Sequence, residues 1–563
     1  MNDRNESLFD VVILGAGING AGLFRDLCEQ GIKCLLVEKT DFGAGTSAAP
    51  SRLIHGGLKY LETGEFSLVA QSTLERNLLL KNAPHCVTPL PTFIPAFSWM
   101  RGIYAALRTL AGSTTAPRSR GALLIKVGLA LYDFYGARHR VMPRHRFLSK
   151  AASRQHIPPL TDSIVAGGIY YDAKISRPER LVYELVRDGL NANSQSRAVT
   201  YTDLVASEAG VLSFRQQDNT TFSVKPSLVV NASGPWIDRV NAALGTPTKM
   251  IGGTKGSHIL LDHPELLQSL KGHMIYFEAD DGRICLVYDY LGFALVGSTD
   301  IPSDNPDAVR CEEPELDYFL DSLRSLLPGL SFDREQVVYS YSGIRPLPAS
   351  DAKNPGLISR DHSAPVLEAN GERPFAIISL VGGKWTTFRG FAEEVTDSVL
   401  ARLDRKRVCS TQNLPIGGGR DFPASDDACA QWVADLAKQY GLSTARAAEL
   451  LSRYGTTARA MLSTPSPYGD DQRLSAAASY SALEIDWLVK HELVVSLADI
   501  VFRRTSMAIE NALSGQTLQE IAAIAAPTLG WDAARQTEEI EAVIQQLRDR
   551  HGVNLRPPMA AAR

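Results

Sequence analysis

The sequence lacks any cysteine pair at the CxxC spacing typical of metal or redox sites, and its 7 cysteines are scattered over 563 residues. It also lacks an apolar run of the roughly 18 residues that span a membrane, and its first ten residues, MNDRNESLFD, do not resemble a secretory signal. We therefore expect no metal site. We expect a cytoplasmic protein with reduced cysteines, which does not prevent it from binding a membrane surface.

A strong excess of either charge is also missing. The 58 Lys and Arg residues nearly balance the 62 Asp and Glu residues, which leaves a net charge of −4 and gives no indication of nucleic-acid binding. We find no internal repeat and no low-complexity tract. A chain of 563 residues is too long for one compact core, so several domains are expected.

The beginning of the chain has the pattern of a nucleotide-binding βαβ unit. Two short apolar runs, FDVVILG and IKCLLVEK, flank a glycine-rich turn and a helical stretch, as in a buried parallel sheet. Gly15, Gly17 and Gly20 have the G-x-G-x-x-G spacing, which lets backbone N–H groups approach a pyrophosphate at a helix N-terminus. Glu38, about 20 residues on, can accept hydrogen bonds from ribose hydroxyls.

The glycine pattern alone does not distinguish NAD from FAD. The segment after Glu38, FGAGTSAAPSRLIHGGLKYLE (42–62), is rich in small and hydroxyl residues such as Thr46 and Ser47, which suit a chain that runs along a flavin. A nicotinamide enzyme usually continues with another helix and strand. We therefore predict FAD.

The rest of the chain predicts an α/β fold with three parts. Apolar strands followed by glycine recur at 227–236 and 375–385, which predicts a discontinuous Rossmann-like domain, whereas 249–301 alternates like antiparallel strands and helical periodicity dominates beyond GGGR (417–420), a predicted hinge. The expected segments are an FAD-binding domain at 1–100, 151–248 and 351–415, a basic amphipathic insertion at 101–150, an antiparallel-sheet substrate domain at 249–350, and an all-helical C-terminal domain at 416–563.

With these motifs, the sequence closely resembles the FAD-linked glycerol-3-phosphate dehydrogenases and oxidases, within the wider D-amino-acid-oxidase-like flavoproteins. The matching segments are GAGINGAG, GTSAAPSRLIHGGLKYLE, NASGPW, KGSHI, GSTD, YSGIRPL, SRDH, GGKWTTFR and DIVFRRTS, in the family's order. The resemblance implies oxidation of sn-glycerol 3-phosphate to dihydroxyacetone phosphate by hydride transfer to FAD. It implies quinone as the electron acceptor, or oxygen as in some relatives.

The resemblance also implies a set of cofactor residues. Those expected to contact FAD are Gly15, Gly17, Asn19, Gly20, Glu38, Lys39, Thr46, Ser47, Ser51, Leu53, His55, Gly56, Gly57, Gly234, Gly383, Lys384 and Thr386. Lys384 follows a strand and a glycine pair, where its charge would raise the flavin's electron affinity. We expect FAD to be held without a covalent link, since no histidine or cysteine occupies a family attachment position after Glu38.

A phosphorylated substrate requires fixed cations, and the planar fork of arginine can bind two oxygens at once. Arg345 and Arg360 match family arginines at the substrate site, although a lone arginine is often a structural ion pair. Lys59, followed by the matching Tyr60, stands where the most similar enzymes generally carry arginine. This departure makes another polyol phosphate, such as a tetritol phosphate, an alternative substrate. An amine or amino-acid oxidase and a non-catalytic flavoprotein are further alternatives.

The hydroxyl proton must leave with the hydride, so a base or a charge stabiliser is needed near that oxygen. His258 is the preferred base, and His55 is the second candidate among 11 histidines, although many histidines are structural. Arg345 can hold the developing oxygen charge and share this role.

The segment 101–150 carries ten Lys or Arg residues and one acidic residue, Asp133, among apolar stretches. Such a composition favours a helix lying on an anionic membrane, and a pair of helices packed on the flavin domain is the alternative. Because quinone-linked relatives are peripheral membrane proteins, we expect the protein on the cytoplasmic face of the inner membrane. A homodimer is compatible with the sequence.

Overall fold

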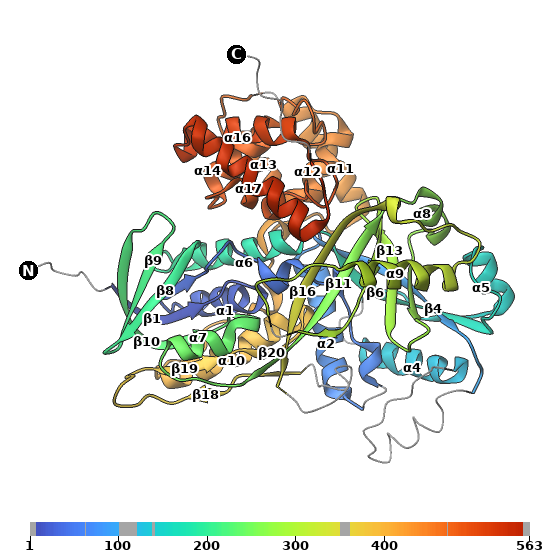
Figure 1. The fold of residues 1–563 in the computed structure, drawn as a ribbon, viewed down its shortest axis with the longest axis horizontal. Helices are drawn as coiled ribbons and strands as arrows, with labels where there is room; N and C mark the ends of the chain where they lie inside the picture. Colours follow the sequence, from blue (N-terminus) through green and yellow to red (C-terminus); the bar gives the residue numbers. More distant parts are fainter. Residues whose placement is uncertain are drawn as a thin grey trace, which may run out of the picture.

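In the computed structural model, which describes residues 7–61, 64–100, 121–137, 141–303, 305–349, 361–469 and 471–555, the chain forms two large β-sheets and a helical C-terminal region. The side chains of Ser7 and Lys59 are not described. In Figure 1 the two sheets lie side by side, and the orange and red helices of the C-terminal region lie above them. Among the described residues, no helix is long and apolar enough to cross a membrane.

The first sheet contains the predicted βαβ unit, with the order β18–β19–β10–β1–β2–β7 and with β9 and β8 continuing from β10. Its strands are β1 (Ser7–Leu14), β2 (Cys34–Val37), β7 (Arg197–Val199), β8 (Thr202–Glu208), β9 (Val211–Gln216), β10 (Thr221–Asn231), β18 (Val366–Leu367) and β19 (Ala376–Ser379). The five strands from β19 to β7 are parallel. Helices α1 (Ile18–Glu29), α6 (Pro178–Ala192) and α10 (Phe388–Arg402) pack together on this sheet, which explains its continuous apolar runs.

The carboxyl ends of three distant strands meet at one edge of this sheet. Leu14 is aligned with Asn231, and Asn231 with Ser379. Open parallel sheets bind their ligands at this edge. The predicted discontinuous Rossmann-like domain is therefore confirmed.

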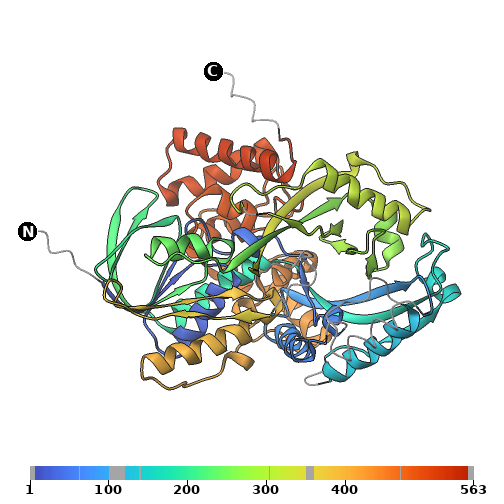
Figure 2. The same cartoon turned by 60° about the horizontal axis from the view of Figure 1, so that its bottom comes forward.

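The second sheet has the order β15–β11–β14–β13–β12–β4–β6–β3, with β16 beside β11 and β5 beside β6. Its strands are β3 (Leu53–Ile54), β4 (Val87–Ala96), β5 (Arg146–Ser149), β6 (Ala166–Ile175), β11 (Ile251–Leu261), β12 (Met274–Glu278), β13 (Ile284–Tyr290), β14 (Phe293–Gly297), β15 (Ile301–Pro302) and β16 (Val337–Pro348). Figure 2 shows α9 (Glu313–Leu326) and α4 (Ala122–Tyr135) on opposite sides of this sheet.

The second sheet extends beyond the expected substrate domain of 249–350. Strands β4 and β6 pair along ten residues each, and β12 joins β4 in parallel. Both strands come from stretches assigned to the FAD-binding domain in the sequence analysis, and β5 comes from the basic insertion. The difference arises because alternating side chains reveal a strand but not its pairing partner.

The C-terminal region is helical, as predicted. Its elements are α11 (Asp426–Tyr440), α12 (Thr444–Tyr454), α13 (Thr457–Ser463), α14 (Ala482–His491), α15 (Leu497–Asp499), the π-helical turn η9 (Ile500–Arg504), α16 (Gly515–Leu529) and α17 (Ala533–His551). Ser481 and Glu484 form a capping box at the start of α14, and Gly530 and Gly552 end the last two helices in the left-handed conformation.

The GGGR segment is closely packed, so the predicted hinge is not supported. A Cβ atom on Gly418 would lie 2.1 Å from the carbonyl oxygen of Tyr454, and the N–H of Thr456 donates to the carbonyl of Gly418 at 2.9 Å. Glycine here permits close approach of two backbones rather than bending.

The remaining helices and strands complete the described fold. They are α2 (Phe66–Asn82), α5 (Lys150–His156), α7 (Ile237–Ala243), α8 (Pro264–Leu270), β17 (His362–Ser363), β20 (Val381–Gly382), and the 3-10 helices η1 (Gly45–Ala48), η2 (Leu58–Leu61), η3 (Gly234–Trp236), η4 (Arg334–Gln336), η6 (Trp385–Thr387), η7 (Thr411–Asn413) and η8 (Gly417–Gly419).

Candidate active site

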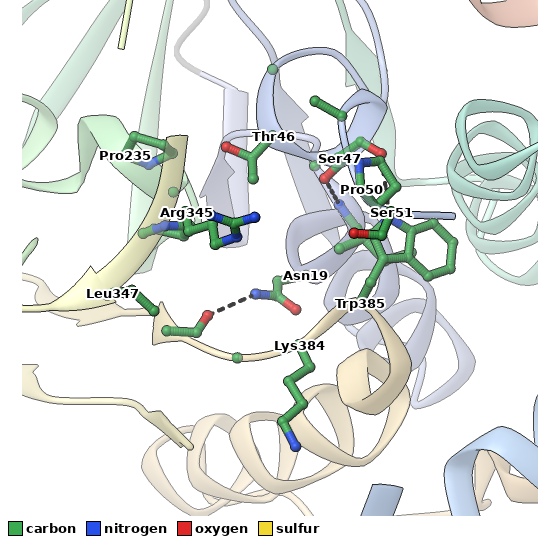
Figure 3. A pocket seen from close by; sticks show the side chains of 18 of the residues that line it. Asn19, Thr46, Ser47, Pro50, Ser51, Pro235, Arg345, Leu347, Lys384 and Trp385 are labelled. Carbon is green, nitrogen blue, oxygen red and sulfur yellow. Dashed lines mark hydrogen bonds between the residues drawn. The ribbon is translucent and has the colours of Figure 1, made fainter. Parts of the chain in front are cut away.

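A cavity of about 1490 Å³ lies where the carboxyl edge of the first sheet faces the second sheet. It brings together most of the residues predicted to bind cofactor or substrate. Those that line it are Gly15, Gly17, Asn19, Glu38, Lys39, Thr46, Ser47, Ser51, Leu53, His55, Gly57, Tyr60, Gly234, His258, Arg345, Gly383, Lys384 and Thr386. Figure 3 shows Asn19 between Arg345 on one side and Ser47 on the other.

Two predicted glycines lie behind the cavity wall. A Cβ atom on Gly20 would lie 2.0 Å from the carbonyl oxygen of Gly15, so this position packs α1 against the turn. The N–H of Gly56 donates to the hydroxyl of Tyr132 at 2.8 Å and to Asp172 at 3.0 Å. Two other predictions cannot be placed, because Arg360 and the side chain of Lys59 lie outside the described residues.

The turn before α1 has no room for side chains. Gly15 has φ +104°, and a Cβ atom there would lie 2.7 Å from the carbonyl oxygen of Ala232. A Cβ atom on Gly17 would lie 3.0 Å from Ser47 Oγ, which accepts a hydrogen bond from the N–H of Ile18 at 2.9 Å. This glycine cradle at a helix N-terminus fits the pyrophosphate of a dinucleotide.

Glu38 is held at the end of β2 by backbone donors. Its carboxylate accepts hydrogen bonds from the N–H of Ala16 at 2.8 Å and of Thr40 at 3.0 Å. These contacts hold the carboxylate beside the glycine turn. The geometry agrees with the ribose-binding role expected from the sequence.

Lys39 contacts Asp307, in the loop that follows β15 of the second sheet. The sequence did not predict this contact. Lys39 Nζ lies 3.9 Å from the ring centre of Trp236 and 3.3 Å from Asp307 Oδ1, which also accepts from Trp236 Nε1. Burial alone would raise the pKa of Asp307, but Arg239, Trp236 and Lys39 lower it to about 2. No local motif marks this contact, since 268 residues separate Lys39 from Asp307.

Asn19 and Lys384 lie near each other at another part of the cavity. Asn19 Nδ2 donates to the carbonyl of Gly382 at 3.5 Å, whereas its buried Oδ1 has no hydrogen-bond partner among the described residues. Lys384 Nζ donates to Ser72 Oγ at 3.2 Å and lies 3.6 Å from the ring centre of Tyr60. A buried acceptor without a partner is suited to a donor supplied by a ligand.

His258 is a buried imidazole on β11. Its Nε2 lies 2.8 Å from Ser51 Oγ, its ring stacks on Tyr341 with 4.9 Å between centres, and its Nδ1 has no partner among the described residues. Burial, followed by the positive charges of Arg345 and Arg52, lowers the pKa of His258 well below its usual value. The imidazole is therefore neutral at physiological pH, with one ring nitrogen unprotonated.

Arg345 lies on β16 opposite Thr254 of β11. Its Nη1 donates to the carbonyl of Thr299 at 3.0 Å and to Asp300 at 3.1 Å, and its Nη2 donates to Ser298 Oγ at 3.0 Å. A Cβ atom on Gly256 would lie 2.2 Å from Nη2, so the guanidinium lies directly over this glycine. Arg345 therefore forms an ion pair with Asp300 and also places a cation on the cavity wall.

His55 lies elsewhere in the same cavity. Its ring stacks on Tyr60 with 6.4 Å between centres, and its backbone N–H donates to Thr386 Oγ1 at 3.2 Å. Both histidines predicted from the sequence are therefore in the cavity wall.

Residues 50–52 are supported by tyrosines of the second sheet that the sequence did not identify. The hydroxyl of Tyr341 donates to the carbonyl of Pro50 at 2.9 Å, and that of Tyr288 to the carbonyl of Ser51 at 3.0 Å. Arg52 forms two hydrogen bonds with Glu179, at 3.2 and 2.9 Å. These contacts hold Ser51 against His258.

One cluster outside the cavity has the residue types of a metal site. His85, Cys86 and Glu184 are buried, with possible ligand atoms within 4.8 Å of one another. However, His85 Nε2 lies 2.8 Å from Glu184, whose other oxygen lies 3.2 Å from Arg180 Nε. Although burial alone would lower it, Cys86 and Glu184 raise the pKa of His85 to about 10. Protonated His85 and Arg180 thus already balance the negative charge of Glu184.

Family models match both halves of the architecture. Residues 10–397 match the family described as FAD dependent oxidoreductase, and residues 409–536 match the C-terminal domain of alpha-glycerophosphate oxidase. The first match includes the glycine turn and the residues from both sheets that line the cavity.

Curated relatives extend over nearly the whole chain. A glycerol-3-phosphate dehydrogenase from Synechocystis is 31% identical and covers 95% of this chain and 95% of its own length. An aerobic glycerol-3-phosphate dehydrogenase from Staphylococcus aureus is 29% identical, with 98% and 97% covered.

Solved structures share the fold. The glycerol-3-phosphate dehydrogenase from Bacillus halodurans, complexed with FAD, has a TM-score of 0.74 at 22% identity and covers 100% of this chain and 98% of its own. The L-alpha-glycerophosphate oxidase from Mycoplasma pneumoniae has a TM-score of 0.53 at 18% identity and covers 72% and 98%. The predicted fold and the FAD cofactor are thus confirmed, and the chain belongs to the FAD-dependent oxidoreductases of the glycerol-3-phosphate dehydrogenase family.

Proposed function

We propose that the protein oxidises sn-glycerol 3-phosphate to dihydroxyacetone phosphate with non-covalently held FAD, and that electrons pass to quinone. One observation carries the proposal: a cation and a neutral imidazole lie on the same face of neighbouring strands in the cavity. Arg345 is opposite Thr254, its guanidinium covers Gly256, and His258 follows two residues later on that face. An alcohol that carries a phosphate group can contact both Arg345 and His258 there.

Each residue then has a defined role. Bound FAD supplies a hydride acceptor. Arg345 binds a phosphate or alcohol oxygen with its fork, while Asp300 keeps the fork in place. His258 takes the hydroxyl proton as the O–H bond breaks, so the substrate loses one hydride and one proton. Ser51 orients the imidazole through its hydrogen bond to Nε2.

One sequence feature favours a second candidate, a longer polyol phosphate such as a tetritol phosphate. The family resemblance of the sequence implies an arginine at the position of Lys59. Lysine offers a point charge rather than a planar fork, so it constrains the position of the phosphate less.

Anaerobic mixing with a panel of polyol phosphates, followed by flavin absorbance, tests the proposal. We expect sn-glycerol 3-phosphate to bleach the flavin fastest and the Arg345→Ala variant to lose about 1.5–3 kcal/mol of transition-state stabilisation with unchanged FAD content. Arg334→Ala is a matched control, because Arg334 pairs with Asp317 at an exposed site. Fastest bleaching by a tetritol phosphate would select the second candidate. Bleaching by none of the compounds would refute the proposed activity.

We further propose that the enzyme binds the anionic cytoplasmic face of the inner membrane through α4. One face of this helix is buried on the second sheet through Ile125, Leu129 and Tyr132. The other face exposes apolar side chains, and exposed cations lie nearby at Lys126, Arg144 and Arg146. The exposed apolar residues are Leu123, Val127, Leu131 and Phe134, which are 48%, 51%, 40% and 73% exposed. Such a helix suits the membrane interface.

Sedimentation with anionic vesicles tests this membrane proposal. We expect the double variant Leu123→Glu with Phe134→Glu to release the protein and slow quinone reduction, while activity with a soluble dye stays unchanged. Val408→Glu is the control, since Val408 is 72% exposed elsewhere. Rising salt should weaken wild-type binding, because each cation near the surface contributes about 1 kcal/mol. Equal sedimentation of the double variant and wild type would refute docking through α4.

A further inference from the structure

A buried carboxylate connects the helical C-terminal region to the cavity. Asp41 belongs to the cavity loop (residues 38–51), which also carries Glu38, Thr46 and Ser47, and it is 0% exposed. Arg504 binds both of its oxygens, at 2.7 and 2.9 Å, and Arg503 Nε donates to Oδ2 at 2.5 Å. Burial alone would raise the pKa of Asp41, but the two arginines lower it to about 2. Asp41 is therefore charged at neutral pH.

The backbone of the C-terminal region is shaped for this contact. Consecutive side chains of an α-helix diverge by about 100°. Arg503 and Arg504 are in a π-helical turn, where the N–H of Thr505 donates to the carbonyl of Ile500 at 2.9 Å. The wider turn directs two consecutive arginines to one carboxylate. Such turns occur frequently at functional sites.

Arg503 reaches the cavity loop by a second route. Arg503 Nη2 donates to Asp499 at 2.7 Å, and Asp499 also accepts from the hydroxyl of Tyr201. The N–H of Tyr201 donates to the carbonyl of Thr40 at 2.8 Å, and the next residue donates to the carbonyl of Glu38 at 3.0 Å. The loop is therefore held from both sides, next to the carboxylate expected to bind ribose.

Beyond Asp41 the cavity loop is held by the rest of the cavity wall. The N–H of Gly43 donates to the carbonyl of Ala16 at 2.9 Å, Thr46 Oγ1 donates to the carbonyl of Ile344 at 2.5 Å, and Ser47 accepts from α1. Asp41 thus supplies the anchor between Glu38 and this stretch. A displaced Asp41 would remove this anchor from the stretch that connects Glu38 to Gly43.

We propose that Arg503 and Arg504 are positioning residues that hold the cavity loop in its FAD-binding conformation, so that the C-terminal helical region sets the affinity for FAD. The two residues lie in DIVFRRTS, a segment to which the sequence analysis assigned no role. The inference rests on the family's cofactor and is independent of which alcohol is oxidised.

The test measures FAD binding to apoprotein by flavin fluorescence, together with thermal unfolding of each apoprotein. Asp41→Asn is compared with Glu492→Gln. Glu492 forms a second buried two-bond pair between the C-terminal region and the rest of the molecule, with Arg180 at 3.1 and 2.9 Å. Both variants lose one charge of a buried pair with little change in shape.

We expect Asp41→Asn to raise the dissociation constant for FAD about tenfold or more, whereas Glu492→Gln changes it by less than about twofold despite a similar loss of thermal stability. Arg504→Lys, which keeps the charge and loses the fork, should give a smaller increase in the same direction and serves if Asp41→Asn does not fold. Unchanged FAD affinity, or an equal rise in both charge variants, would overturn the proposal. Neither result affects the polyol phosphate proposal, which bleaching of FAD-saturated enzyme tests separately.

Discussion

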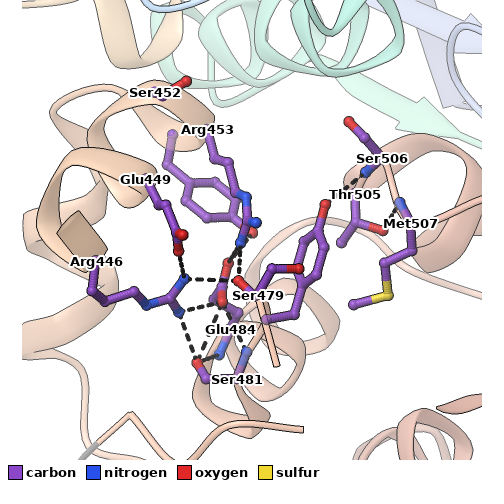
Figure 4. A network of polar contacts seen from close by, with 12 residues as sticks. Arg446, Glu449, Ser452, Arg453, Ser479, Ser481, Glu484, Thr505, Ser506 and Met507 are labelled. Atoms are coloured by element: carbon purple, nitrogen blue, oxygen red, sulfur yellow. Dashed lines mark hydrogen bonds and ion pairs between the residues drawn. The ribbon is translucent and has the colours of Figure 1, made fainter. Parts of the chain in front are cut away.

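The cavity and the helical C-terminal region differ in how they satisfy buried polar side chains. In the helical region Arg446 donates to both oxygens of Asp471 at 2.8 Å. Arg446 and Arg453 both bind Glu484 (Figure 4). Glu484 also accepts from the hydroxyl of Tyr454. Within the described stretches 416–469 and 471–555, every buried side-chain nitrogen and oxygen has a hydrogen-bond partner.

In the cavity, by contrast, buried polar atoms are left without partners. Asn19 Oδ1 and His258 Nδ1 have none among the described residues. Because an unpaired buried polar atom costs free energy, its presence on a cavity wall indicates a ligand that pairs with it. Complete pairing indicates a structural role, and incomplete pairing at a cavity indicates binding or catalysis. Four predictions test this comparison.

The largest effect is expected at His258. His258→Asn should lower kcat by about 10²- to 10⁴-fold, the usual contribution of a general base, with FAD content unchanged. His156 is the matched control, since its Nε2 also lacks a partner but the residue does not line the cavity. Steady-state kinetics of both variants checks this. A similar loss in His156→Asn would break the link between cavity location and catalysis.

The next effect concerns the paired network. Glu484→Gln removes the charge of a carboxylate that pairs with two buried arginines, Arg446 and Arg453. It should lower the free energy of unfolding by about 3–5 kcal/mol, with kcat of the folded enzyme unchanged. Glu449→Gln, at a carboxylate that is 43% exposed and pairs with the same Arg446, should cost at most about 1 kcal/mol. Denaturant unfolding measures both. Comparable losses would contradict the structural role assigned to burial.

A third effect is the pH dependence caused by His551, whose Nδ1 lies 2.9 Å from the carbonyl oxygen of Ser340. Burial lowers the pKa of His551 to about 4, from 6.5, despite the opposing hydrogen bond to Ser340. Between pH 6.5 and 4 the unfolded chain binds a proton that the folded chain does not. The titration of His551 therefore leaves the free energy of unfolding unchanged above pH 6.5 and lowers it as the pH falls to 4.

The size of this loss is about 3 kcal/mol, from the linkage between pKa and stability. His551→Phe retains an aromatic ring against Tyr339 and removes the titrating group. Unfolding measured at several pH values should show a shallower acid decline for the variant than for wild type. Parallel declines would show that His551 does not remain neutral in the folded protein.

The smallest effect is expected at Asn19. Asn19→Ala removes the unpaired Oδ1 and one of the predicted FAD contacts, so the dissociation constant for FAD should rise by about 2- to 10-fold, as expected for one hydrogen bond of about 0.5–1.5 kcal/mol. Flavin fluorescence titration of apoprotein measures it. Unchanged affinity would mean that Oδ1 pairs with water rather than with FAD.

Local patterns were sufficient for much of the fold and the site. The apolar runs and glycines of residues 9–39 predicted the βαβ unit, and periodicity predicted the helical C-terminal region. Motif order predicted a cavity containing His258, Arg345 and Lys384. These predictions succeeded because a glycine turn, a short buried strand or an amphipathic helix is determined by residues close together in the chain.

The sequence by itself therefore determined the family, the cofactor and the residue types of the cavity wall. Only the tertiary structure decided which distant residues support the cavity wall. Asp307 pairs with Lys39, and the arginines of η9 pair with Asp41. Tyr288 and Tyr341 donate hydrogen bonds to the backbone of residues 50–52. It also decided that β4 and β6 join the second sheet and that GGGR is packed rather than a hinge. The physical reason is that such contacts depend on register and packing between segments that are not neighbours in the chain, which leave no periodic trace in either segment.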